Sequence, residues 1–149
     1  MSTDAHRPAV ASGLPTTEFG FPGRLRDRLV AAILDGSKTS TTALALAYQM
    51  EEEPLPQAGD RSVLVDSEGH PVAVLEATDV RVVPLGEVDL SHALDEGEGH
   101  QTVAQWRGEH ESFWHSPQMR AVFGDPGFTV DDTTPVVLEH FRVVARLPD

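Results

Sequence analysis

The spacing of apolar residues along the chain predicts both helices and strands. Apolar positions recur every three to four residues over 23–35, and Gly36 suits the left-handed position that ends a helix. The same kind of reading predicts three further helices, over residues 43–50, 91–96 and 102–116. Runs of β-branched residues predict four strands, over residues 39–42, 61–65, 71–83 and 135–147.

The order of these elements favours an α+β fold. The strands follow one another without a regular alternation of strand and helix, which is typical of antiparallel sheets. We therefore expect a small, partly closed β-barrel of mostly antiparallel strands with helices at its rim. Residues 1–17 carry no apolar period and are expected to form a flexible tail. Residues 18–149 are then expected to form one domain.

Composition narrows the possible functions. The chain has 149 residues and a formal net charge of −13, which disfavours tight non-specific binding of a polyanion. It contains no cysteine, so disulfides, thiolate metal sites and cysteine nucleophiles are excluded. No run of apolar residues is long enough to cross a membrane, and no signal sequence is evident, so we expect a cytoplasmic protein without a membrane partner.

One positive cluster lies within the first predicted helix. Arg24 precedes Leu25, and Arg26, Asp27 and Arg28 fill the positions between Leu25 and Leu29. Charged residues at such positions usually face water. We expect all four to form the solvated face of this helix.

The segment that follows this helix is a candidate site. Lys38 precedes four hydroxyl residues, and in a strand Thr39 and Thr41 share one face while Ser40 and Thr42 share the other. A lysine acts as general base for a Ser or Thr nucleophile when burial favours its neutral form. The alternative is a polar edge strand beside an exposed lysine.

Residues 92–100 contain three carboxylates in a glycine-rich turn. Neighbouring carboxylates favour protonation of one another, so Glu96 is a candidate acid, although a solvated acidic turn is the alternative. The histidines of residues 92–115 do not match a standard metal-ligand spacing. We expect neither a metal nor a cofactor. Trp106 and Arg107 are a candidate pair for stacking on and contacting a substrate.

Three blocks of the sequence resemble the ASCH domain, a PUA-like family associated with RNA. They are residues 18–44, 51–88 and 96–114. The family signature G-x-K-x-x-E-x-R is matched at Gly36 and Lys38, while Thr41 stands at the Glu position and Ala43 at the Arg position. The resemblance implies a PUA-like barrel that binds a nucleoside or single-stranded RNA.

Bacterial members that hydrolyse 4-acetylcytidine also carry Thr in place of that Glu, but they keep the Arg. By this resemblance Thr41 is the nucleophile, Lys38 its base and Glu96 the proton donor, with Thr39 as a further substrate contact. Two alternatives are a regulatory module that binds RNA without catalysis and a metal-independent ribonuclease that acts on single strands. No oligomeric state follows from the sequence.

Overall fold

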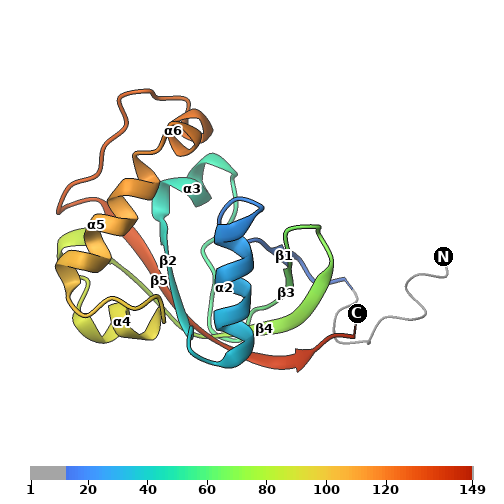
Figure 1. The fold of residues 1–149 in the computed structure, drawn as a ribbon. Helices are drawn as coiled ribbons and strands as arrows, with labels where there is room; N and C mark the ends of the chain where they lie inside the picture. Colours follow the sequence, from blue (N-terminus) through green and yellow to red (C-terminus); the bar gives the residue numbers. More distant parts are fainter. Residues whose placement is uncertain (1–12, 149) are drawn as a thin grey trace. The chain divides into compact units, whose positions relative to one another are not determined.

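The structure, a computed structural model, describes residues 13–148. It confirms the predicted α+β class (Figure 1). The α-helices of this part are α2 (Arg24–Asp35), α3 (Ala45–Met50), α4 (Leu90–Asp95), α5 (Val103–Trp114) and α6 (Pro117–Phe123). The strands are β1 (Thr16–Thr17), β2 (Ser40–Leu44), β3 (Arg61–Val65), β4 (Pro71–Pro84) and β5 (Pro135–Arg146), and a 3₁₀ turn η2 spans Leu85–Glu87.

The described strands form one five-stranded sheet in the order β1-β3-β4-β5-β2. Strands β3 and β4 are antiparallel, and Val63 pairs with Val74 in their register. β1 is parallel to β3 and pairs Thr16 with Val63. Since β1 and β2 are the two ends of this order, the sheet does not close into the barrel that we expected, and edge strands remain.

The chain forms two compact units that share the two longest strands. The first comprises residues 13–39, 56–79 and 140–148 of the described chain, and the second comprises Ser40–Leu55 and Val80–Glu139. Of the predicted tail, residues 1–12 lie outside the described residues. Each unit has its own apolar core.

The core of the first unit forms where α2 packs on the sheet. Leu29, Val30 and Ile33 of this helix pack with apolar side chains of β3, β4 and β5. The helix ends where Gly36 takes φ 89°, and its N–H donates to the carbonyl of Ile33. Positive φ is a conformation that glycine adopts without steric cost. This turn directs the chain into the segment that carries Lys38.

Arg26 corrects our expectation for the polar positions of α2. Only 5% of the residue is exposed, and its guanidinium donates to the carbonyls of Phe19, Gly20 and Asp66 at 3.3, 2.9 and 3.4 Å. Glu18 lies 3.5 Å away and provides the opposing charge. Arg26 therefore faces the interior and ties α2 to two loops, whereas Arg24, Asp27 and Arg28 are exposed as predicted.

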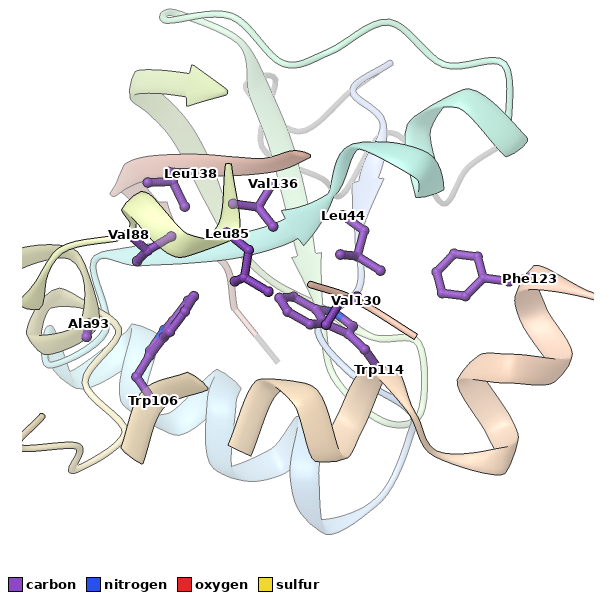
Figure 2. Close-up of a cluster of buried hydrophobic side chains, with 10 residues drawn as sticks. All are labelled: Leu44, Leu85, Val88, Ala93, Trp106, Trp114, Phe123, Val130, Val136 and Leu138. Atoms are coloured by element: carbon purple, nitrogen blue, oxygen red, sulfur yellow. The ribbon is translucent and has the colours of Figure 1, made fainter. Parts of the chain in front are cut away.

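The core of the second unit is built around two tryptophans of α5. Figure 2 shows Trp106 and Trp114 rising from this helix toward Leu85 and Leu44. Trp106 has no exposed surface, and Trp114 is 3% exposed. Large aromatic side chains supply much of the buried area that stabilises so small a core.

Most predicted elements are confirmed within one or two residues, but α6 was missed. No element was predicted for residues 117–123, where this helix of seven residues lies. A local signal was present, because the side chain of Ser116 accepts a hydrogen bond from Met119 N and Pro117 occupies the first turn. A Ser-Pro pair before apolar residues predicts a helix start.

Candidate functional site

The predicted site residues divide between the two units. Lys38 and Thr39 belong to the first unit, and Thr41, Glu96, Trp106 and Arg107 belong to the second. Within the second unit, the structure joins Glu96 directly to neither Thr41 nor Arg107. The partners of Glu96 are instead Thr42, His92 and His110, which the sequence analysis did not predict as members of one site.

Lys38 lies in the segment between α2 and β2. Its backbone N–H donates to the carbonyl of Ala32, and its ammonium lies 5.9 Å from the centroid of the Phe19 ring. Only 2% of the residue is exposed. The amino nitrogen of Lys38 therefore lies over the ring face of Phe19 and away from water.

A cleft of about 270 Å³ lies beside Lys38 in the first unit. Its lining joins the end of α2 to the middle of β5 and comprises Ile33, Leu34, Asp35, Gly36, Lys38, Thr39, Phe141, Arg142 and Val143. Two of these side chains are basic. Arg142 donates to Glu76 at 2.8 and 3.0 Å, so part of its charge is already balanced.

The two faces of β2 separate Thr41 from Thr42. Ser40 and Leu44 are buried in the second unit, and Ser40 Oγ donates to the carbonyl of His92 at 3.2 Å. Thr42 shares their face because side chains alternate along a strand, whereas Thr41 points to the opposite face. The hydroxyl that reaches the α4 region is therefore that of Thr42.

Glu96 is the centre of a buried polar cluster at the end of α4. Thr42 Oγ1 donates to Glu96 Oε2 at 2.5 Å, and His92 Nε2 lies 3.2 Å from the same oxygen. His110 Nε2, from α5, lies 3.0 Å from Glu96 Oε1. We call Thr42, His92, Glu96 and His110 the Glu96 cluster. Each carboxylate oxygen has a partner, as a buried carboxylate requires.

The cluster has a defined direction of hydrogen bonding on its Thr42 side. A hydroxyl has one hydrogen, and Thr42 donates it to Glu96. His92 Nε2 lies 2.7 Å from Thr42 Oγ1, so this nitrogen donates to the hydroxyl oxygen. The result is a chain of hydrogen bonds that runs from His92 through Thr42 to Glu96.

His110 is held between the carboxylate and two tryptophans. Its ring stacks on Trp106 at 4.3 Å between centroids and meets Trp114 edge-on at 5.4 Å. Burial lowers the pKa of His110, but the hydrogen bond and negative charge of Glu96 outweigh burial, together with the Trp106 carbonyl and the charge of Glu98. The pKa of His110 is thus raised above its ordinary value, which favours the charged imidazolium.

The other two predicted contacts of α5 have different surroundings. Trp106 is covered completely, and its indole N–H has no hydrogen-bond partner among residues 13–148. Arg107 donates to Glu111 at 2.9 Å and also to Asp132. The hydrogen bond to Asp132 is the main cause of the raised pKa of Arg107.

Sequence reasoning missed Thr42, His92 and His110 as members of one cluster. His92 and Glu96 are four residues apart, a spacing that puts two side chains on one face of a helix. That spacing was the available signal for His92. Within the described range 13–148, no three His, Cys, Asp or Glu side chains are arranged to hold a metal ion.

Comparison with protein-family models identifies the family of this chain. The model of the ASCH domain matches residues 16–145, which is most of the chain. The protein belongs to the ASCH domain family. ASCH domains have a PUA-like fold, and the family is thought to bind RNA. No curated protein matches this chain.

Two crystal structures resemble this ASCH domain over nearly its whole length. Protein EF3133 from Enterococcus faecalis V583 is 28% identical, with a TM-score of 0.77, and the match covers 89% of this chain and 77% of that one. An ASCH domain from Lactobacillus crispatus JV V101 is 26% identical, with a TM-score of 0.76, covering 91% and 82%. In the described part of the chain, no helix has the length and apolar character of a membrane span.

Proposed function

We propose that this ASCH domain hydrolyses the acyl amide of a modified nucleoside such as 4-acetylcytidine. The observation that carries the proposal is the buried carboxylate of Glu96, which is held by one hydroxyl and two imidazoles. Breaking an amide requires a proton donor for the leaving amine. The Glu96 cluster contains such a donor.

A buried carboxylate with two imidazoles beside it destabilises the folded state, and a protein that only binds its ligand gains nothing from it. Burying a carboxylate costs free energy that a hydrogen-bonded partner offsets only in part. Proteins place such groups where acid–base chemistry is needed, because burial and neighbouring charges adjust proton affinity. His110, whose pKa is raised, is such a neighbour of Glu96.

The roles of the reacting residues follow the family resemblance, and they require Thr41, on the face of β2 opposite to Thr42, to reach the same amide bond as Glu96. Thr41 attacks the acyl carbonyl, Lys38 accepts the proton of Thr41, and Glu96 protonates the departing amine. Backbone N–H groups stabilise the oxyanion. Water then attacks the acyl-Thr41 ester, Lys38 returns its proton to Thr41, and Glu96 takes up the proton of the water.

The remaining predicted contacts concern substrate binding. Thr39, Trp106 and Arg107 stay predictions as substrate contacts, and in the structure the ring of Trp106 contacts His110. Ala43 lacks the guanidinium that the 4-acetylcytidine hydrolases carry at this position. We infer that this protein prefers a substrate whose acyl group needs no such contact. The net charge of −13 favours a small nucleoside over a long polyanion.

A second candidate function is binding of RNA or a nucleotide without catalysis. The cleft beside Lys38 favours it, because Lys38 and Arg142 lie in its lining and can attract a phosphate. In this case Lys38 would contact phosphate, and binding would weaken as salt concentration rises.

The test is to incubate the protein with N4-acylated cytidines and, separately, with a single-stranded RNA, and to resolve the products by mass. Lys38→Ala is compared with Arg28→Ala, which removes an exposed cation from α2. Deacylated nucleoside from wild type and Arg28→Ala but not from Lys38→Ala supports the hydrolase. Intact nucleosides would contradict it, and salt-dependent RNA binding or RNA cleavage in chelator would then favour the binding module or the ribonuclease.

A further inference from the structure

One proton is shared between Glu96 and His110, and the geometry requires it. The Nδ1 of His110 lies 2.9 Å from the carbonyl oxygen of Trp106. A carbonyl oxygen accepts and never donates, so Nδ1 carries a hydrogen. A neutral His110 would then have no hydrogen on Nε2, the atom 3.0 Å from Glu96 Oε1.

Two oxygen or nitrogen atoms at this distance need a hydrogen between them. Either His110 is an imidazolium beside an ionised Glu96, or His110 is neutral beside a protonated Glu96. Both arrangements hold the same single proton on the line between the two atoms. The Trp106 carbonyl therefore fixes the imidazole so that Nε2 can only exchange a proton with Glu96.

His110 is the most exposed of the three titratable groups in the Glu96 cluster. The exposed fraction of its side chain is 14%, against 0% for His92 and 1% for Glu96. Glu98 acts on His110 through its charge, and the ring of His100 lies 6.4 Å from the His110 ring and is paired with Glu109. The other groups against it are the rings of Trp106 and Trp114, which do not titrate.

We propose that His110 is a positioning residue that stores the proton delivered by Glu96 in the proposed hydrolysis. The proposal rests on that function. The proton passes from His110 Nε2 to Glu96 Oε1, and Glu96 gives it to the nitrogen of the leaving amine as the C–N bond breaks. When water attacks the acyl-enzyme, its hydroxyl bonds to the acyl carbon, and its proton returns through Glu96 to His110. The proton balance then closes over one turnover.

The kinetic test uses His110→Gln, because the glutamine amide can donate to Glu96 but cannot transfer a proton. We expect kcat to fall by about 10²-fold, as for loss of a general acid–base group, with little change in KM. The alkaline limb of the kcat profile should move, and added imidazole should raise the rate of the variant only. His70→Gln is the matched control, since His70 is an exposed histidine of the first unit. An unchanged kcat and pH profile in His110→Gln would overturn the proposal.

A second measurement needs neither activity nor a change at His110. The imidazole of His110 is titrated by NMR in the wild type and in Glu96→Gln. We expect the substitution to lower the His110 midpoint, because the shared proton loses its carboxylate. An unaltered midpoint would overturn the proposal even with an active enzyme. A different result would be a shifted midpoint together with a wild type that is inactive on every acylated nucleoside. That result would refute the proposed hydrolysis itself. It would also overturn the role of His110 in it, although the shared proton would be present.

Discussion

The hydroxyl of Thr42 donates a hydrogen bond of 2.5 Å to Oε2 of Glu96. The two residues are 54 positions apart, so the bond joins β2 to the end of α4. It leaves Oε1 of Glu96 to His110. Thr42 therefore orients a buried carboxylate whose second oxygen faces the group with which it exchanges a proton.

Thr42→Val should destabilise the protein by about 1.5–3 kcal/mol, the cost of removing a hydrogen bond to a buried charged group. Valine keeps the shape and the β-propensity of threonine, so packing is little changed. Urea unfolding measures the difference. Thr41→Val is the matched control on the opposite face of β2 and should change the unfolding free energy by about 1 kcal/mol or less. Equal losses in the two variants would contradict the orienting role of Thr42.

The same two threonines show how far the sequence predicts the site. The strand and its alternation were predictable from the hydroxyl-rich run, and the resemblance pointed to Lys38, Thr41 and Glu96. Which face of β2 meets α4 depends on tertiary packing, which alternation alone does not determine. His110 reaches Glu96 from another helix, 14 residues along the chain, and no local spacing predicts that contact.

The stability of the wild type should fall as the pH rises above about 6.5. The folded-state pKa of His110 is raised above that of the unfolded chain. Its stabilisation is therefore complete below the unfolded pKa and is lost as pH rises through the folded pKa. Urea unfolding across this range provides the measurement.

Glu96→Gln is the control for this pH dependence. Without the carboxylate, burial is the largest influence on His110 and lowers its pKa. The stabilisation that His110 loses with rising pH is then smaller, and the other histidines cancel in the comparison. A decline with pH of equal size in the wild type and in Glu96→Gln would show that His110 is not its source.

Arg26→Ala should destabilise the protein by about 3 kcal/mol, because three carbonyls lose their buried donor. Arg26→Lys should recover less than half of this loss, since one ammonium cannot reach three diverging acceptors. Chemical unfolding measures both. Arg28→Ala, an exposed change on the same helix, should cost about 0.5 kcal/mol or less. If Arg26→Ala lost no more stability than Arg28→Ala, the result would contradict the role of Arg26 in anchoring α2.

Two signals in the sequence conflict at Arg26. Residue 26 lies three and four positions before Leu29 and Val30, so helical periodicity alone places it on the buried face. Arginine is rarely buried without partners. Its partners here are backbone carbonyls of two loops, and no side-chain pattern in the sequence reports them. The helix was therefore predictable, while the contact that anchors it was not.

Tyr48 is the only tyrosine of the chain, which makes its ionisation measurable by ultraviolet absorbance. Burial, assisted by the negative charges of Glu139, Glu53 and Glu51, raises the pKa of Tyr48 to about 12. A rapid pH jump, read before the chain unfolds, should give a phenolate midpoint near this value. The same titration in denaturant should return a midpoint of about 10.

This shift also has a consequence for stability. The unfolded chain releases the phenolic proton at lower pH than the folded one, so the unfolding free energy should fall as pH rises above about 10. Tyr48→Phe cannot ionise and should lose less stability over the same range. Glu139→Gln should lower the folded midpoint, since it removes one of the repelling charges. A folded midpoint of about 10 in the wild type would mean that water reaches the phenol and would contradict its burial.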